Sequence, residues 1–313
     1  YPLSDPEDMP SGLGAEVQAY ITRAFLGGDG KPQKVLLSLI GSSDDVVNAG
    51  CAALASSDFD YLALPAEVEA EQMTAAVTWL EGARKKYCIG KLVLPNHKAD
   101  NPAAVNFVAT GIKAGGQTYD AGDYCSRIAG VLAGTPINSS ATATPLPEVS
   151  GVDEIADPNA AADNGQLILI HDGRKVKLGR AVNSLTTVSG DMSESLRKIK
   201  IVEALDLIRS QCRGVIEDKY IRMANSYDNK MLLVSEIHAF LQELESEGVI
   251  QAGSSFVEIN LVKQKQWLKE HGVDVSGLSD QEILKADTGS WVFLRMGGAV
   301  LDAMEDFDLD YYM

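Results

Sequence analysis

Strand-like and helical segments alternate through the first 120 residues, and this alternation limits the possible folds more than any other feature of the sequence. Short strands that are joined by helices form βαβ units, in which neighbouring strands run parallel. The helical segments are 15–26, a segment capped by Ser43 or Asp44 that ends at Ala55, and 67–86; the strand-like segments are 34–40, 61–64 and 89–94. We therefore predict an α/β domain with a mostly parallel sheet and flanking helices.

The middle of the chain contains a further hairpin signal. Its predicted elements are a helix over 124–132, an exposed acidic loop rich in Pro and Ala over 145–164, and two strands over 166–171 and 175–182. The Asp172-Gly173 pair between the two strands favours a tight turn, because both residues tolerate the left-handed backbone that such turns require.

Helices dominate the C-terminal part. The clearest one spans 193–220, where apolar residues recur every three or four positions and form a single face. The other predicted helices are 229–247, 262–271 and 279–285. Together with a terminal strand, they indicate an α+β arrangement.

The last residues of the chain alternate strictly between apolar and acidic side chains. Phe307, Leu309 and Tyr311 are separated by aspartates at 306, 308 and 310. A period of two predicts a strand with one apolar and one acidic face. A terminal strand of this kind either pairs with a sheet in another chain or folds back onto its own sheet, and the spacing alone allows both.

The charge and the apolar runs exclude several classes of partner. The chain of 313 residues has 27 basic and 44 acidic residues, which gives a net charge of −17. Such a polyanion repels nucleic acid, which proteins hold mainly through Lys and Arg. No apolar run is long enough to cross a bilayer, and no secretion signal opens the chain. The four cysteines are widely spaced, which predicts buried thiols in a reducing compartment, with no metal and no cofactor.

One alternative for the function of an α/β domain of this kind is that of an α/β hydrolase or a nucleotide-binding enzyme. It predicts a convergent polar cleft at the carboxyl ends of the parallel strands. The sequence contains no P-loop, no dinucleotide fingerprint and no nucleophile elbow. In Gly134-Thr135-Pro136 a proline stands where a subtilisin-type site needs its serine, so no hydroxyl is available for attack. His97 with Asp60 or Asp44 is then an incomplete pair.

In the segments 128–136, 176–186, 198–220 and 289–294, the sequence resembles the phage tail sheath family. The segment 128–136 (IAGVLAGTP) is similar to the family's I-A-G-x-x-A-G-T-P stretch, and 176–186 (VKLGRAVNSLT) is similar to its strand ending in R-x-V-N-T/S-L-T. The segment 198–220 resembles the family helix K-I-x-V-x-E-A-x-D-x-I, and 289–294 (GSWVFL) resembles the penultimate strand. The segments follow the family's order over most of the chain, which makes the resemblance specific.

The resemblance implies a structural protein with two parts. The first, residues 1–187, is expected to be a subtilisin-like α/β domain without an active site. The second, residues 188–313, is expected to be a C-terminal domain that carries intersubunit contacts and ends in an exchange strand at about 302–312, with Phe307, Leu309 and Tyr311 as its apolar face. The family's N-terminal arm is expected to be missing before Tyr1.

The resemblance also implies a setting for the chain. Sheath subunits form hexameric rings that stack helically around an inner tail tube, between a baseplate and a tail terminator. The chain is expected in the tail of a virion or phage-like particle that is assembled in the bacterial cytoplasm. A part of the baseplate is a second alternative.

A short basic helix offers a candidate contact with the tube. Lys263, Lys265 and Lys269 lie close together in a strongly acidic chain. We predict that they contact an acidic tube wall. The competing interpretation is a solvated helix face.

Overall fold

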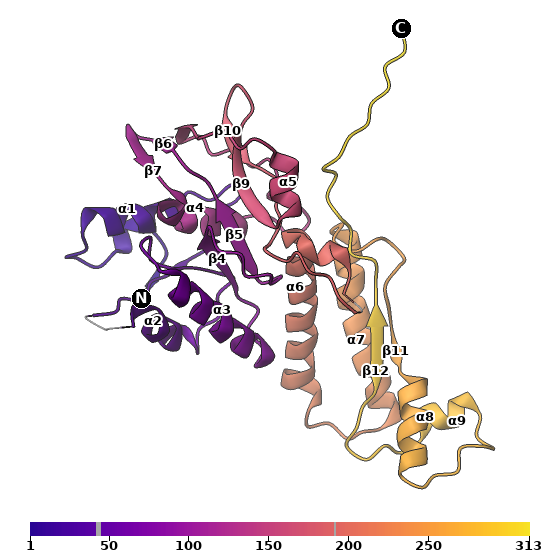
Figure 1. Cartoon of the computed structure of the whole chain (residues 1–313). Helices are drawn as coiled ribbons and strands as arrows, with labels where there is room; N and C mark the ends of the chain where they lie inside the picture. The colour runs from indigo at the N-terminus through magenta and orange to yellow at the C-terminus, as the bar shows by residue number, and fades with distance from the viewer. Residues whose placement is uncertain (42–44, 191) are drawn as a thin grey trace. The chain divides into compact units, whose positions relative to one another are not determined.

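A computed structural model describes residues 1–41, 45–190 and 192–313 (Figure 1). Its contacts divide the chain into two units. Unit 1 comprises residues 1–203 and 303–313, and unit 2 comprises residues 204–302. The division thus lies inside a helix, after the predicted boundary at residue 187, and the last residues belong to unit 1.

A five-stranded sheet forms the centre of unit 1. Its strand order is β10-β9-β5-β4-β3. The strands are β3 (Tyr61–Ala63), β4 (Lys91–Pro95), β5 (Ala104–Val108), β9 (Gln166–His171) and β10 (Val176–Leu178). All neighbours pair in parallel except β9 and β10, which form the hairpin predicted from Asp172-Gly173. The prediction of a mostly parallel sheet is therefore confirmed.

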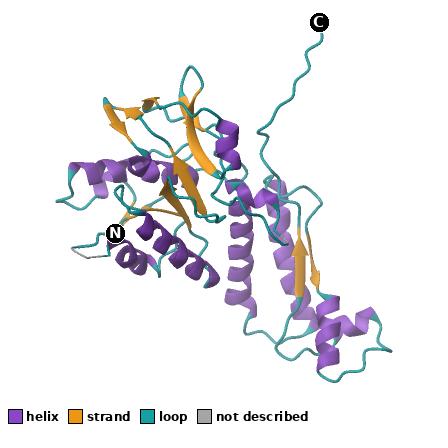
Figure 2. Cartoon of the chain, viewed as in Figure 1, coloured by secondary structure: helices purple, strands orange, loops and turns teal. Residues whose placement is uncertain are grey.

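Helices cover both faces of this sheet (Figures 1 and 2). The helices of unit 1 are α1 (Ala15–Ala24), α2 (Val46–Leu54), α3 (Ala70–Lys85), α4 (Ala121–Ala133) and α5 (Pro158–Asp163). Neighbouring residues of a strand point to opposite faces, so Val93 packs in the core with α4, whereas Leu92 and Leu94 pack in the core with α2 and α3. Apolar residues in sequence along β4 are thus explained by burial on both sides.

Two glycines allow α1 and the loop after it to lie close to α4. A Cβ atom on Gly130 would lie 1.9 Å from the carbonyl oxygen of Ala24, in α1. A Cβ atom on Gly134 would lie 2.3 Å from the carbonyl oxygen of Gly30. Real Cβ atoms do not approach other atoms this closely, so the glycines of the 128–136 segment are required by packing.

Smaller sheets complete unit 1. One is a three-stranded sheet of β6 (Ile112–Ala114), β7 (Gln117–Tyr119) and β8 (Val149–Gly151), in the order β7-β6-β8. The other pairs β1 (Pro2–Leu3) with β2 (Val35–Leu36) in antiparallel fashion.

The structure differs from two local predictions, and a third prediction falls outside the described residues. The strand predicted over 34–40 is only β2, and it pairs with β1 outside the main sheet. The exposed loop predicted over 145–164 is wrong, because Leu146 and Val149 are buried in the core and β8 and α5 lie in this stretch. The cap predicted at Ser43 or Asp44 falls outside the described residues, and the Asp45 side chain accepts a hydrogen bond in the first turn of α2.

Unit 2 combines long helices with a two-stranded antiparallel sheet of β11 and β12. A 3-10 turn (Glu194–Arg197) precedes α6 (Ile199–Val215), which begins in unit 1, continues into unit 2 and ends in a π-helical turn (Ile216–Tyr220). The other elements are α7 (Tyr227–Ser246), β11 (Phe256–Ile259), α8 (Leu261–Glu270), α9 (Asp280–Lys285) and β12 (Leu294–Gly297). The helices predicted over 229–247, 262–271 and 279–285 are confirmed, whereas the helix predicted over 193–220 is α-helical only over Ile199–Val215. The strand inferred over 289–294 begins only at Leu294.

Within the parts of the chain that the structure describes, no helix has both the length and the apolar character needed to span a membrane.

Candidate assembly surfaces

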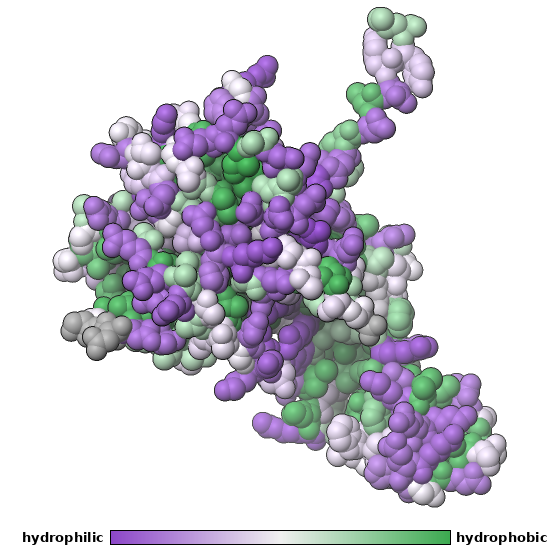
Figure 3. Space-filling model, in the orientation of Figure 1, coloured by the Kyte–Doolittle hydropathy of each residue, from purple (hydrophilic) through white to green (hydrophobic). Residues whose placement is uncertain are grey.

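The C-terminal tail, residues 303–313, forms no helix or strand in the described structure. The three apolar residues of the predicted strand are almost fully exposed: Phe307 is 80% exposed, Leu309 87% and Tyr311 83%. Figure 3 shows hydrophobic and hydrophilic residues next to one another along this tail. Among the residues that the structure describes, the tail pairs with no strand of its own chain, and pairing with another chain stays a prediction.

The two-stranded β11–β12 sheet has two open edges. Its strands pair in antiparallel register, with Val257 opposite Met296 and Ile259 opposite Leu294. The pairing extends to a bridge between Ile250 and Val300. No further strand joins this sheet among the residues of 1–41, 45–190 and 192–313. Open edges present unpaired amide and carbonyl groups, which form a template for a strand from another chain.

The three candidate tube-contact lysines do not share one side of α8. Residues on a helix are separated by about 100° each, so Lys265 and Lys269 lie on one side, while Lys263 lies about 160° from Lys265. Lys263 and Lys269 are exposed and Lys265 is half-buried. The contact of these lysines with a tube wall stays a prediction, and Lys265 and Lys269 are the two that could share one contact.

Helix α8 is firmly attached to the rest of unit 2. The Asn260 side chain accepts a hydrogen bond from the Lys263 amide at 3.0 Å and so caps the helix. The buried Gln264 side chain donates to the carbonyl oxygens of Ile283 and Leu284, at 2.6 and 3.1 Å. The helix thus presents its lysines from a rigid support.

The residues of the incomplete hydrolase pair are separated by the sheet. Asp60 directly precedes β3, whereas His97 follows the end of β4. Because β3 and β4 are parallel, Asp60 lies at the amino ends of the strands and His97 at their carboxyl ends. Asp44 lies outside the described residues. Leu64 and Ala109, which follow β3 and β5 at the carboxyl edge, are buried apolar residues, so these two strand ends supply no polar group to a cleft.

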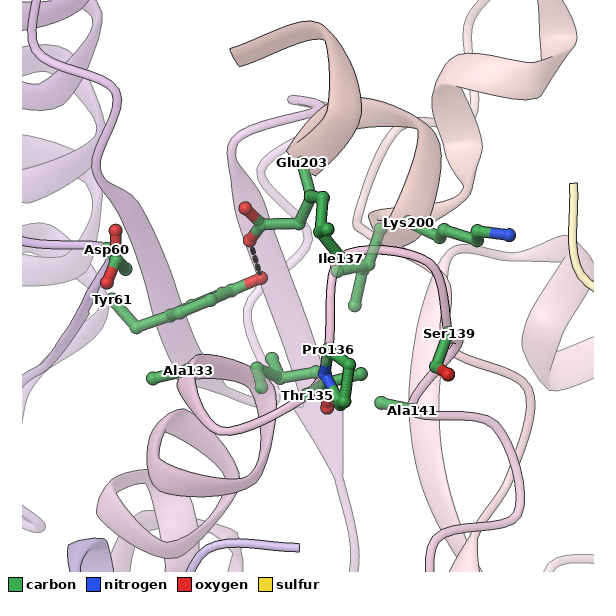
Figure 4. A pocket seen from close by; sticks show the side chains of 12 residues that line it. Asp60, Tyr61, Ala133, Thr135, Pro136, Ile137, Ser139, Ala141, Lys200 and Glu203 are labelled. Carbon is green, nitrogen blue, oxygen red and sulfur yellow. Dashed lines mark hydrogen bonds between the residues drawn. The ribbon is translucent and has the colours of Figure 1, made fainter. Parts of the chain in front are cut away.

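A small pocket does include Pro136, and two of the polar side chains that line it, Tyr61 and Glu203, bind each other (Figure 4). It lies at the amino end of β3, whereas α/β enzymes bind ligands at the carboxyl ends of the strands. The Tyr61 hydroxyl donates a hydrogen bond to Glu203, and Lys91 forms an ion pair with the same carboxylate at 3.1 Å. The pocket volume of 180 Å³ is below the roughly 300 Å³ of typical ligand sites.

Three of the four cysteines, at 51, 125 and 212, are buried free thiols. Burial raises the pKa of the Cys51 thiol to about 11, and it also raises the pKa of Cys125 and Cys212. Such thiols stay protonated at neutral pH. Across the described ranges, no group of three His, Cys, Asp or Glu residues could hold a metal ion.

Comparisons with known proteins agree with an assembly role. No protein-family model matches the chain. The tail sheath protein of Clostridium phage phiCD119 is 35% identical over 323 aligned positions, which cover 99% of this chain and 89% of the phage protein.

Solved structures share the fold. The sheath tail protein of Desulfitobacterium hafniense has a TM-score of 0.63 at 21% identity, over 73% of this chain and 56% of that protein. The helical sheath of the anti-feeding prophage in its contracted state has a TM-score of 0.71 at 14% identity, over 100% of this chain and 87% of that one. With a phage sheath protein 35% identical over nearly its full length, this chain belongs to the tail sheath protein family.

Proposed function

We propose that the chain is a structural subunit of a contractile tail sheath, which polymerises around an inner tube and contracts to drive the tube through a target envelope. Membership of the tail sheath family supports this function. The observation that carries it is the exposed end of the tail, whose apolar residues at 307, 309 and 311 are each at least 80% exposed. A single chain does not bury this apolar face, and a neighbouring subunit would.

The tail would act by strand exchange. Residues 307–313 would add to an open edge of the β11–β12 sheet in another subunit. Phe307, Leu309 and Tyr311 would then lie on the buried face. Strand addition gives affinity through main-chain hydrogen bonds, and alternate side chains give register. Main-chain pairing of this kind would keep subunits joined while side-chain contacts between them break and form again during contraction.

The particle around the subunit follows from the family. Its partners would be other sheath subunits in hexameric rings and a helical stack, the inner tail tube, the baseplate and the tail terminator. Assembly would take place in the bacterial cytoplasm. Unit 1 would serve as a subtilisin-like scaffold without catalysis. Pro136 and the separation of Asp60 from His97 at opposite ends of the parallel strands support this role.

Electron microscopy of tail variants tests the function. The chain, expressed with its tube protein, should form striated hollow tubes. The variant Phe307→Ser/Leu309→Ser/Tyr311→Ser keeps the length of the tail but loses its apolar face, and it should stay monomeric. The control Asp308→Ser/Asp310→Ser changes only the acidic face and should still form tubes. Tubes from the triple variant would exclude the exchange strand, and a wild-type chain that never forms tubes would exclude the sheath function.

Contact with the tube would involve Lys265 and Lys269. Exposed ion pairs contribute only about 0–1 kcal/mol each, so such contacts release easily when the sheath contracts. Lys265→Glu/Lys269→Glu should lower co-sedimentation of the tube with the sheath. Lys263→Glu, on another side of α8, should have a smaller effect. Equal effects of the two changes would favour a solvated helix face over a specific contact.

A further inference from the structure

The base of the tail is buried although the rest of it is exposed. The Glu305 side chain is only 5% exposed, whereas Met304 and Phe307 on either side are at least 80% exposed. One Glu305 carboxylate oxygen accepts hydrogen bonds from the Ser140 hydroxyl at 3.0 Å and from the Thr142 hydroxyl at 2.5 Å. The other oxygen lies 3.2 Å from the Lys198 ammonium group in an ion pair. Glu305 is therefore held from two sides by unit 1.

The partners of Glu305 are themselves part of a network. Thr142 Oγ1 accepts a hydrogen bond from the Ala181 amide at 2.9 Å. Lys198 forms a β-bridge with Val182, next to Ala181. One carboxylate thus joins three separate segments of unit 1, namely the loop after α4, the residues after β10 and the residue before α6.

A second, weaker contact lies beside it. Asp306 forms an ion pair with Arg180, but Asp306 is 75% exposed, so solvent screens this pair. The buried Glu305 contributes more, because removing one partner of a buried, hydrogen-bonded charge leaves the other uncompensated.

The course of the chain gives these contacts a mechanical meaning. The chain leaves unit 1 within α6, passes through unit 2 and returns to unit 1 at residue 303. Two contacts lie just before this return, at the end of the β11–β12 sheet. The Leu301 amide donates a hydrogen bond to the Val249 carbonyl, and Val300 forms a β-bridge with Ile250. Without an attachment at 305, a pull on the tail would act directly on these last pairs and separate β12 from β11 one bond at a time.

We propose that Glu305, aided by Asp306, is a clamp that transfers tension on the tail into unit 1. The clamp thereby prevents this tension from separating the two strands of the β11–β12 sheet in unit 2. The tension would come from the neighbouring subunit that holds the tail, so this role rests on the proposed sheath function. The β11–β12 sheet that accepts a neighbour's tail would then be protected from the pull on the subunit's own tail.

Single-molecule pulling on the full chain tests the clamp without any assembly. One handle is attached to unit 1 at the exposed Glu154, as Glu154→Cys, and the other at the C-terminal Met313. Once the clamp opens, unit 2 should extend by up to about 340 Å, the length of residues 204–302 as an extended chain. In Glu305→Ala this extension should occur at a clearly lower force, whereas Asp308→Ala, which changes a tail acid beyond the clamp, should behave as the wild type.

The conservative variant keeps the test decisive. Glu305→Gln can still accept from Ser140 and Thr142 but loses the charge that faces Lys198, so its extension force should lie between those of the wild type and Glu305→Ala. It also serves if Glu305→Ala does not fold. An unchanged force in the variants would overturn the clamp and leave the sheath function intact, because tube formation by the wild-type chain is measured separately.

Discussion

Single side chains in the loops of unit 1 hold segments that are distant in sequence. Asp100, an exposed residue, accepts hydrogen bonds from the Thr186 amide at 2.6 Å, the Thr186 hydroxyl at 3.0 Å and the Thr187 amide at 2.9 Å. These hydrogen bonds hold the pKa of the Asp100 carboxyl well below its usual range, because they favour the charged form. Asp100 thus attaches the residues after β10 to the loop after β4.

Asp100→Asn should lower stability in a pH-dependent way. A carboxyl whose pKa is depressed in the folded state stabilises that state above the unfolded pKa of about 4, and this contribution disappears as pH falls through the folded pKa. The variant should lose about 1 kcal/mol of unfolding free energy at pH 7, since the site is exposed and solvent limits the effect. Urea unfolding between pH 3 and 7 measures it. The difference from the wild type should shrink below about pH 4, and Asp310→Asn in the tail should show no difference.

Packing between elements depends on glycines whose neighbours are fixed backbone atoms. Gly130→Ala places a methyl group where the Ala24 carbonyl oxygen lies, so α1 must move away from α4. We expect a loss of about 1–3 kcal/mol in unfolding free energy. Gly82→Ala in α3 is the matched control. A Cβ there meets nothing within 4 Å, so the change should stabilise the helix by about 0.5–1 kcal/mol. Equal effects at the two positions would contradict the close helix contact.

The helices could be predicted from sequence more completely than the strands. Helical periods depend on local spacing, and α3, α7 and α9 begin and end near the predicted residues. Strand β5 was not predicted, because its apolar run is interrupted by Asn106, which is 3% exposed in the central sheet. The acidic stretch at 145–164 looks like a loop by composition, yet Leu146 is buried there by contacts with distant elements. Such long-range contacts leave no local pattern.

The candidate surfaces were predicted to a similar, partial extent. The alternation of apolar and acidic residues predicts a strand in the tail, because a period of two is visible in the sequence itself, but the tail forms no strand within the described chain. The role of Glu305 was not visible, since Ser140 and Thr142 lie 165 and 163 residues away along the chain. The three lysines are near one another in sequence, and only the turn of α8 separates Lys263 from the other two.

The charge of the whole molecule predicts how association responds to salt. Each subunit has a net charge of −17, so identical subunits repel at long range. The Debye length falls from about 30 Å at 0.01 M to about 8 Å at 0.15 M salt, which shortens this repulsion. Light scattering should therefore show larger assemblies at the higher salt concentration. The triple serine variant of the tail should stay monomeric at both, and assembly that weakens with salt would contradict the argument.

Unit 2 is an insertion within unit 1, because the chain enters it after residue 203 and leaves it before residue 303. A segment whose two ends both connect to one scaffold can be lengthened, shortened or replaced while the scaffold keeps its own core. In evolutionary terms, unit 2 is a cassette. Lineages of these particles could diversify it, and engineers could exchange it, while Glu305 keeps the same place of attachment for the tail.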